Sequence, residues 1–380
     1  MLKENDEQTR MIIETISKFS REVLAPKAAE VDSEELFPHD SWKKLSELGF
    51  AGLLVDPAYN GMGLDYCTLV GVVEEIAKGC VSMAGIYLVH STVNYYLSAF
   101  GSEDQKKHHL PTLADGSSIG AMCITEPGAG SDVSALRSSA RREGDQYIIN
   151  GGKVFITSGG EADLYIVLAK VGSSDGAKGL STFIVEKDRP GLSFGKKEKK
   201  MGYGGSSTRQ LIFEDCAVPH DHLLGKEGAG FKIMMMGLDR GRVSTGAMAV
   251  GLAQVAFDEA VDYARGRLQF GSPISQFQGI QWMFADMTIE IEAARLLVHR
   301  AAGLCDRDKP FTKEAAMAKC FASDAAMRVT TDVVQIYGGY GYMREYPAER
   351  HMREAKFMQI VEGTNQIQRN IIAREIFKGS

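Results

Sequence analysis

The chain has 380 residues, and this length suggests two or three domains or one large one. Its hydrophobic content of 44% and charged content of 24% are usual for a soluble globular protein. Its net charge of −6 gives no sequence-wide basic footprint for nucleic acid, and no apolar run approaches the roughly 18 residues that a membrane span needs. The six cysteines are scattered without a CxxC pair, which argues against a zinc site and favours small core thiols in a reducing compartment.

Residues 1–115 are predicted to form helices. Apolar side chains recur at helical spacing over 12–24, and Pro26 is expected to end or kink that helix. Two further helical patterns cover 68–78 and 84–100. The first third of the chain therefore predicts a helical N-terminal domain.

Residues 116–225 change to the two-residue period of strands. Short β-like runs occur at 119–125, 147–149, 154–157, 164–171, 182–186 and 210–213. The pair Asn150-Gly151, between two of these runs, predicts a hairpin turn. Antiparallel hairpins imply a small β-barrel or sandwich rather than a parallel doubly wound sheet.

Residues 226–380 return to helical spacing. Long periodic stretches at 234–265, 275–304 and 313–337, joined by short links, predict a bundle of about four helices. The predicted fold class is therefore mainly α with a central β-barrel. It comprises a helical N-domain (1–115), an antiparallel β-barrel middle (116–225) and a C-terminal four-helix bundle (226–380).

Glu362 is the first candidate for chemistry. It follows an apolar run at 357–361 and precedes Gly363, and Thr364 or Asn365 would cap a helix that begins there. A carboxylate against apolar side chains loses solvation, which raises its pKa and makes it a useful general base near neutral pH. The alternative from local pattern alone is a surface Glu before a terminal helix.

Three other stretches have features that a ligand site would use. Residues 123–132 follow a strand and hold two glycines, and 154–160 place an aromatic and a hydroxyl where they would flank a flat ring. Residues 335–342 put three glycines and three tyrosines after a helix. Each has a plain alternative as a loop, an edge strand or a helix end. Asp239 and Arg242, three residues apart, predict an ion pair on one helix face in either case.

These stretches, in this order, resemble the signatures of the acyl-CoA dehydrogenase family. The matching segments are 123–135, 208–224, 335–354 and 361–369, and the resemblance covers nearly all of the chain. It implies FAD bound noncovalently and α,β-dehydrogenation of an acyl-CoA thioester. It also implies electron transfer to electron-transfer flavoprotein, and a homotetramer built as a dimer of dimers.

The resemblance assigns roles to individual residues. Glu362 resembles the catalytic base; the base position of some other members falls on Gly241, which has no acidic side chain. Positions that resemble FAD contacts are Met122, Cys123, Ile124, Thr125, Ser131, Phe155, Ile156, Thr157, Arg267, Phe270, Gln278, Gln335, Ile336, Tyr337, Gly338, Gly339, Thr364 and Gln366, some of them supplied by the neighbouring subunit. Positions that resemble substrate contacts are Ser131, Asp239, Arg242, Val361 and Gly363. No metal is implied.

The acyl group is less narrowly specified. The expected pocket helix at 84–94 contains no Arg or Lys, which disfavours a dicarboxylic acyl-CoA. Its Tyr87, His90 and Asn94 lie at helical spacing and would polarise or shorten the pocket, although His90 also suits a structural role. We expect a short-chain, branched or cyclic acyl-CoA.

Three alternative functions remain open at this point. They are an acyl-CoA oxidase, a non-dehydrogenating lyase or desulfinase on the same scaffold, and a flavin-free acyl-CoA-binding protein. The acidic, polar start of the chain at 1–7 is unlike a signal or transit peptide. We therefore expect a cytoplasmic bacterial protein, or a mitochondrial matrix protein if the chain is a processed eukaryotic one.

Overall fold

The computed structural model describes residues 7–172 and 176–378. The first part is helical, with α1 (Glu7–Phe19), α2 (Ala28–Ser33), α3 (His39–Glu47), α4 (Tyr66–Gly79), α5 (Val81–Phe100) and α6 (Glu103–Ala114). The predicted interruption at Pro26 is confirmed, because α1 passes into a π turn at Ser20–Leu24 and a 3₁₀ turn at Ala25–Lys27. Side-chain caps begin α4 and α6, from Asp65 and Ser102 respectively.

The middle part is a sheet. Its strands are β1 (Gly120–Cys123), β2 (Ser139–Glu143), β3 (Gln146–Thr157), β4 (Leu164–Val171), β5 (Leu180–Glu186), β6 (Leu192–Lys197), β7 (Thr208–Pro219) and β8 (Leu223–Leu224). They pair in the order β6-β7-β3-β2-β4-β5-β8, with β1 beside β4. This path does not close on itself, so the sheet is open and the predicted barrel describes it only loosely. Most pairs are antiparallel, but β4 pairs parallel with both β1 and β2.

The predicted hairpin at Asn150-Gly151 is wrong. Both residues lie inside β3, and the turn between β2 and β3 is at Gly144-Asp145. At Gly151 the register against β7 shifts, and a Cβ there would come within 2.4 Å of the Ser138 hydroxyl. Gly151 therefore permits a β-bulge and a close contact with Ser138, and it does not form a turn.

The last part is helical again, as predicted. It contains α7 (Gly230–Gly266), a small hairpin of β9 (Leu268–Gln269) and β10 (Ser272–Pro273), and then α8 (Gln278–Asp306), α9 (Thr312–Tyr337), α10 (Ala348–Met358) and α11 (Asn365–Phe377). Short 3₁₀ turns lie at Phe50–Gly52, Pro57–Tyr59, Val133–Ala135, Gly176–Gly179, His220–His222, Ile274–Gln276 and Gly338–Tyr342. The domain boundaries near 115 and 225 stay a prediction.

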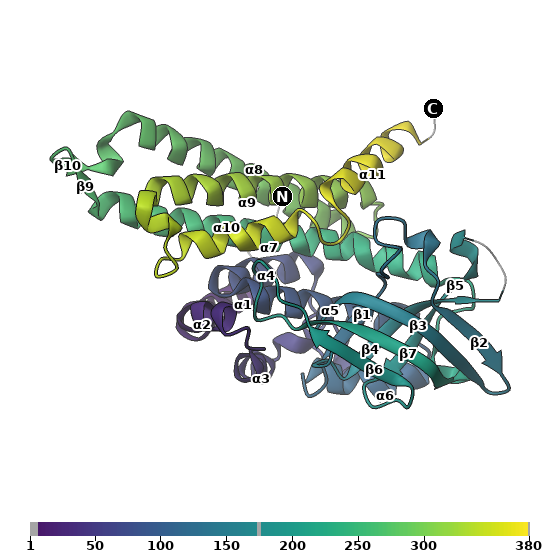
Figure 1. The fold of residues 1–380 in the computed structure, drawn as a ribbon. Coiled ribbons are helices and arrows are strands. Elements are labelled where there is room, and N and C mark those ends of the chain that lie inside the picture. Colours follow the sequence, from purple (N-terminus) through teal and green to yellow (C-terminus); the bar gives the residue numbers. More distant parts are fainter. Residues whose placement is uncertain (1–6, 173–175, 379–380) are drawn as a thin grey trace.

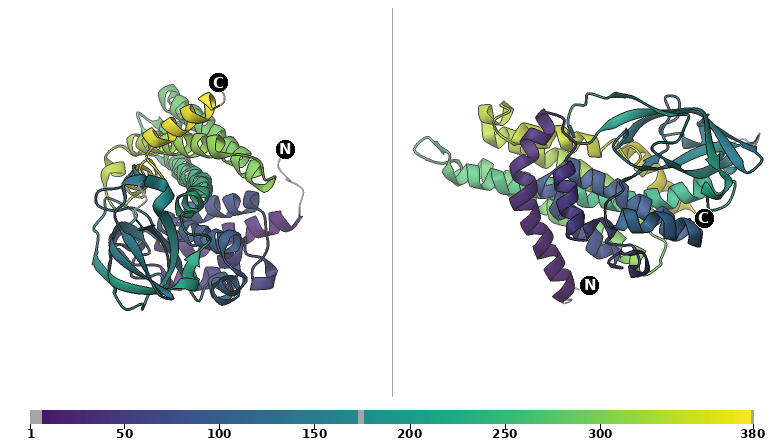
Figure 2. Two further views of the ribbon diagram at one scale, coloured as in Figure 1. Left: turned by 90° about the vertical axis from the view of Figure 1, so that its right-hand side faces the viewer. Right: turned by 90° about the horizontal axis from the view of Figure 1, so that it is seen from below.

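Helices α7 to α10 lie side by side as an elongated bundle (Figure 1). The N-terminal helices and the sheet both lie below this bundle in Figure 1, and Figure 2 shows the same arrangement from two other sides. The β9–β10 hairpin projects from one end of the bundle, and the sheet lies toward the other end. One continuous apolar core connects all three parts. None of the described helices has the length and apolar character to cross a bilayer.

Candidate active site

Glu362 lies on the short loop that joins α10 to α11. Thr364 caps α11 by accepting a hydrogen bond from the Ile367 amide at 3.3 Å, which confirms the predicted helix start. Glu362 has a φ of 55°, in the left-handed region that non-glycine residues seldom adopt, and Gly363 follows at 87°. Such a conformation costs on the order of 1–3 kcal/mol, so the surrounding contacts must hold it.

Several side chains hold this loop through its carbonyl oxygens. Gln368 Nε2 donates to the carbonyls of Glu362 at 3.0 Å and Gly363 at 2.7 Å. Lys319 Nζ donates to the Gly363 carbonyl at 2.9 Å, and Arg242 Nε lies 3.4 Å from the Glu362 carbonyl. The Glu362 amide N–H, in contrast, donates to no acceptor among the described residues. It is therefore available to a ligand oxygen.

Glu362 is half-buried, and its carboxyl group is incompletely paired. Its Oε2 is shielded from solvent and has no hydrogen-bond partner among the described residues. Burial raises the pKa of Glu362 to about 7, although the charges of Arg242 and Lys319 act in the opposite direction. A base with this pKa is partly ionised near neutral pH, which suits proton abstraction.

Helix α7 leaves space for the carboxylate at Gly241. A Cβ built on Gly241 would come within 2.7 Å of Glu362 Oε2. The carboxylate thus occupies the volume that a side chain at this position of α7 would fill. An acidic side chain at position 241 would occupy the same space as the Glu362 carboxylate, so this site has room for only one of the two.

Gly241→Ala is expected to impair the reaction far more than the fold. The added methyl meets the far end of a flexible side chain, so the carboxylate moves while the helix stays in place. A shift of about 1 Å in a catalytic group can reduce the rate by about 10²-fold. Flavin reduction by acyl-CoA, the reaction that the resemblance to the acyl-CoA dehydrogenase family implies, and the thermal midpoint are to be measured together. A large loss of stability at unchanged rate would contradict this view of the pocket.

The predicted Asp239–Arg242 ion pair is confirmed on α7. Arg242 Nη1 donates to Asp239 Oδ1, and Thr312 Oγ1 donates to Asp239 Oδ2 at 2.6 Å. Arg242 is buried, and its guanidinium also approaches the Glu362 carbonyl. The pair therefore joins α7 to the start of α9 and to the Glu362 loop.

A second group of candidate residues lies where β1 and β3 end. The Val154 amide donates to the Thr125 carbonyl at 2.8 Å, which joins the two predicted flavin segments. Phe155 has a φ of 57° and is 69% exposed, so its ring faces away from the core. Among the described residues, the hydroxyls of Thr125 and Thr157 make no hydrogen bond, and Ser158 Oγ is buried without a partner. An exposed aromatic ring beside unpaired hydroxyls fits a flat ring with polar edges.

The remaining residues of these two segments differ in burial, and therefore in whether their side chains can contact a ligand. Cys123 and Ile156 are buried in the core, so only their backbone can reach a ligand, whereas Met122 and Ile124 are half-buried. Ser131 is exposed on the loop between β1 and β2.

A buried ion pair supports that loop. Lys153 Nζ donates to Glu126 Oε1 at 2.8 Å and to the Ile124 carbonyl at 3.2 Å. Glu126 also accepts from the amides of Arg137 and Ser138 at 2.6 and 2.9 Å. Both side chains are buried. The pair thus links β3 to both ends of the loop that carries Ser131.

The other predicted FAD contacts lie at the opposite end of the bundle. Arg267 follows α7, Phe270 is at the hairpin tip, Gln278 starts α8, and 335–339 end α9. Asp239 and Arg267 are separated by 28 positions, of which nearly all are helical, or about 40 Å along the axis. Phe270 is 96% exposed. One chain therefore does not bring these residues to Glu362. Thr364, on the loop that joins α10 to α11, and Gln366, in the first turn of α11, are close to Glu362 in sequence and space.

The polar residues of α5 have structural roles. His90 contacts the Leu113 carbonyl at 3.0 Å and accepts from the Gly120 amide at 3.2 Å. Tyr87 and Asn94 donate to the carbonyls of Phe50 and Ala51. All three side chains are buried. We therefore replace the prediction that they polarise or shorten a pocket: their hydrogen bonds attach α5 to the neighbouring segments.

Sequence reasoning missed several residues that surround Glu362. The charge of Glu362 adds to burial, the larger cause, in raising the pKa values of Tyr66 on α4, Tyr96 on α5 and Tyr203 between β6 and β7. Lys319 on α9 was also missed. A lysine within the otherwise small and apolar run at 315–322 was the one available signal; the tyrosines had none.

Comparisons with known proteins agree across the whole chain. Three family models match: acyl-CoA dehydrogenase N-terminal domain over 6–117, middle domain over 121–216 and C-terminal domain over 228–377. An acyl-CoA dehydrogenase of Bacillus subtilis (strain 168) is 45% identical over 371 residues, which cover 97% of this chain and 98% of the relative.

Two solved structures are similar over their full length. The first comes from work on an electron transferring flavoprotein of Acidaminococcus fermentans and has a TM-score of 0.98 and 47% identity. The second is butyryl-CoA dehydrogenase from Megasphaera elsdenii, with a TM-score of 0.97 and 42% identity. In both cases 100% of each chain is covered.

Proposed function

The chain belongs to the acyl-CoA dehydrogenase family of FAD-dependent oxidoreductases, and we propose that it oxidises a short acyl-CoA to the 2-enoyl-CoA and passes the electrons to an electron-transfer flavoprotein. The observation that carries this proposal is Glu362 Oε2, which lies beside Gly241, is shielded from solvent and has no hydrogen-bond partner among the described residues. A carboxylate oxygen placed in this way can accept a proton from a bound substrate.

The proposed reaction uses groups that the chain supplies. Glu362 takes the α-proton of the thioester. Its amide N–H, which has no acceptor among the described residues, donates to the thioester oxygen as negative charge develops there. FAD, when bound, would supply the hydride acceptor that removal of two electrons from the substrate requires. Phe155, Thr125 and Thr157 would hold the flavin ring, whereas Asp239 and Arg242 would lie toward the CoA portion.

We propose a homotetramer in which one subunit completes the FAD site of another. The separation of Arg267, Phe270 and Gln278 from the Glu362 end of the same chain supports this, because a second copy is needed to bring them together. On α8, the exposed side chains of Trp282, Ile289 and Leu296 repeat every seven residues and form an apolar face suited to another subunit. A monomeric mass by light scattering, with FAD bound, would contradict the proposal.

A short acyl chain is favoured by two tyrosine rings near Glu362, Tyr96 and Tyr203, which pack against glycines of α7 and α5. A Cβ on Gly237 would come within 2.2 Å of the Tyr96 ring, and one on Gly85 within 1.0 Å of the Tyr203 hydroxyl. The two phenol rings thus fill the spaces that the glycines open. The absence of Arg and Lys from α5 disfavours a second carboxylate on the acyl group.

The test is anaerobic titration of the purified flavoprotein with butyryl-, isobutyryl-, octanoyl- and glutaryl-CoA. Butyryl-CoA or isobutyryl-CoA is expected to bleach the visible flavin band promptly, and octanoyl-CoA and glutaryl-CoA to do so slowly or not at all. A yellow protein that no saturated acyl-CoA bleaches would refute the dehydrogenase function and favour a non-redox member. Hydrogen peroxide formed in air at the rate of substrate loss would favour an oxidase.

A further inference from the structure

Lys319 is a fully buried lysine behind the catalytic loop. It lies in the first half of α9, and none of its surface is exposed. Its Nζ donates to the Gly363 carbonyl at 2.9 Å and to Asn365 Oδ1 at 2.8 Å. Among the described residues, no carboxylate lies within ion-pair distance of this ammonium. An unpaired buried cation is costly, so its position calls for a reason.

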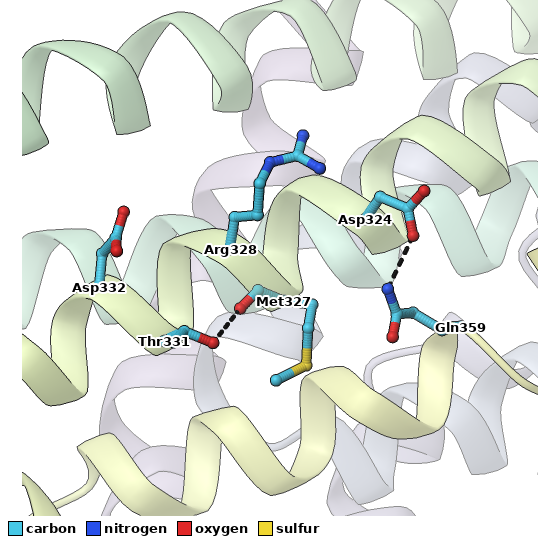
Figure 3. Close-up of a pocket in the computed structure, with 6 residues that line it drawn as sticks. All are labelled: Asp324, Met327, Arg328, Thr331, Asp332 and Gln359. Atoms are coloured by element: carbon cyan, nitrogen blue, oxygen red, sulfur yellow. Dashed lines mark hydrogen bonds between the residues drawn. The ribbon is translucent and has the colours of Figure 1, made fainter.

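The contacts of Lys319 form the inner end of a polar network that clamps the loop. Asn365 donates to Ser323 Oγ at 2.9 Å and to Asp324 Oδ1 at 2.7 Å. Gln359, at the start of the loop, donates to the same Asp324 oxygen at 2.7 Å (Figure 3). Both ends of the 359–365 segment are therefore tied to α9. Asp324, on the outer side of the network, lines a surface pocket of about 300 Å³, whereas Lys319 has no exposed surface.

Charged and titratable groups face Glu362 from five elements. They are Tyr66 on α4, Tyr96 on α5, Tyr203 between β6 and β7, Arg242 on α7, and Lys319 on α9. Arg242 is already paired with Asp239. Burial lowers the pKa of Lys319 to about 8, against the opposing charge of Glu362, so the lysine remains cationic at neutral pH.

We propose that Lys319 is a positioning residue for Glu362. It holds the strained 362–363 turn through the Gly363 carbonyl, and it places behind the carboxylate a positive charge that favours the ionised, proton-accepting form. This inference rests on the proposed role of Glu362 as the base. This role accounts for the buried ammonium, because Glu362 is the acidic group with the largest electrostatic effect on the Lys319 pKa.

Two substitutions separate the hydrogen bond from the charge. Lys319→Met removes both, whereas Lys319→Gln keeps N–H donors and removes the charge. Lys313→Met is the control, because Lys313 lies on the same helix with a partly exposed side chain that pairs with Glu314. Each variant is examined as the FAD-loaded protein in two ways. One is the pH dependence of flavin bleaching by butyryl-CoA, and the other is hydrogen–deuterium exchange of the 359–365 segment by mass spectrometry.

Both Lys319 variants are expected to shift the acid limb of the pH profile upward by about one pH unit, because loss of a nearby cation raises the pKa of a carboxyl group. At pH 6 this lowers the rate about tenfold, since the base is ionised about tenfold less often. Exchange of 359–365 is expected to accelerate in Lys319→Met and to remain near the wild-type rate in Lys319→Gln. Lys313→Met should match the wild type in both measurements.

An unchanged acid limb in Lys319→Gln overturns the electrostatic half of the proposal. Unchanged exchange in Lys319→Met overturns the half concerned with holding the loop. If Lys319→Met does not fold, Lys319→Gln decides the charge effect, and Lys319→Ala under the same exchange measurement decides the loop effect. A wild-type protein that butyryl-CoA and the other acyl-CoAs leave unbleached refutes the proposed function instead, and the exchange comparison still tests the contact with the loop.

Discussion

Glu362→Gln is expected to slow flavin bleaching by acyl-CoA by roughly 10²–10⁴-fold, which is about 3–5 kcal/mol of barrier, while the protein stays yellow. The substitution keeps the shape of the side chain and the free amide N–H but removes the proton acceptor. Flavin retention is expected because the residues that resemble the main ring contacts lie on β1 and β3. Anaerobic stopped-flow absorbance measures the rate, and Glu14→Gln, at an exposed position on α1, is the control. Near-wild-type turnover would refute the assignment of the base.

The same variant is expected to be more stable than the wild type at alkaline pH. The carboxyl group has an ordinary pKa of 4.5 when unfolded and a pKa raised by burial to about 7 in the fold. Below the unfolded pKa the carboxyl group is protonated in both states, so the folded protein bears no free-energy cost for ionising it in a buried site. As pH rises through 7 the penalty reaches its full size, about 3 kcal/mol, because the unfolded chain ionises first. Urea unfolding at pH 4 and pH 8 should therefore show the gain only at pH 8.

Lys153→Met is expected to destabilise the protein by about 3–5 kcal/mol, the usual cost of leaving one member of a buried ion pair unpaired. Burial alone would raise the pKa of Glu126, yet Lys153 and the Ser138 and Arg137 groups hold it below its ordinary value. Without the ammonium, Glu126 keeps two amide donors and loses its counter-charge. The Ile124 carbonyl also loses its partner, so FAD binding is expected to weaken together with stability.

Thermal and urea unfolding of the flavin-loaded protein measure this effect. Lys199→Met removes an exposed lysine and serves as the control. Adding Glu126→Gln to Lys153→Met leaves no buried charge and is expected to recover part of the loss. A Lys153→Met variant within about 1 kcal/mol of wild type would show that water or backbone donors satisfy Glu126 without the lysine.

Local pattern was sufficient for most of the helical structure. The stretches at 234–265, 275–304 and 313–337 form α7, α8 and α9, because their apolar residues recur at the period of a helix and each helix packs against the others. The strand region was located correctly but not its topology. Asn150-Gly151 has the composition of a hairpin turn, yet pairing with β7 and the approach of Ser138 keep it inside β3. Such pairing depends on residues far away in sequence.

The sequence by itself determined the family and the loop that carries Glu362. The apolar run before Glu362, Gly363 and the Thr364 cap are all local, and the motifs occur in order. Only the tertiary structure decided the surroundings that suit Glu362 to its proposed role as the base. Its burial, the space left by Gly241 and the cation of Lys319 come from α7 and α9. Desolvation and Coulomb interactions depend on distance in space, and the chain encodes that distance only through the packing of the whole fold.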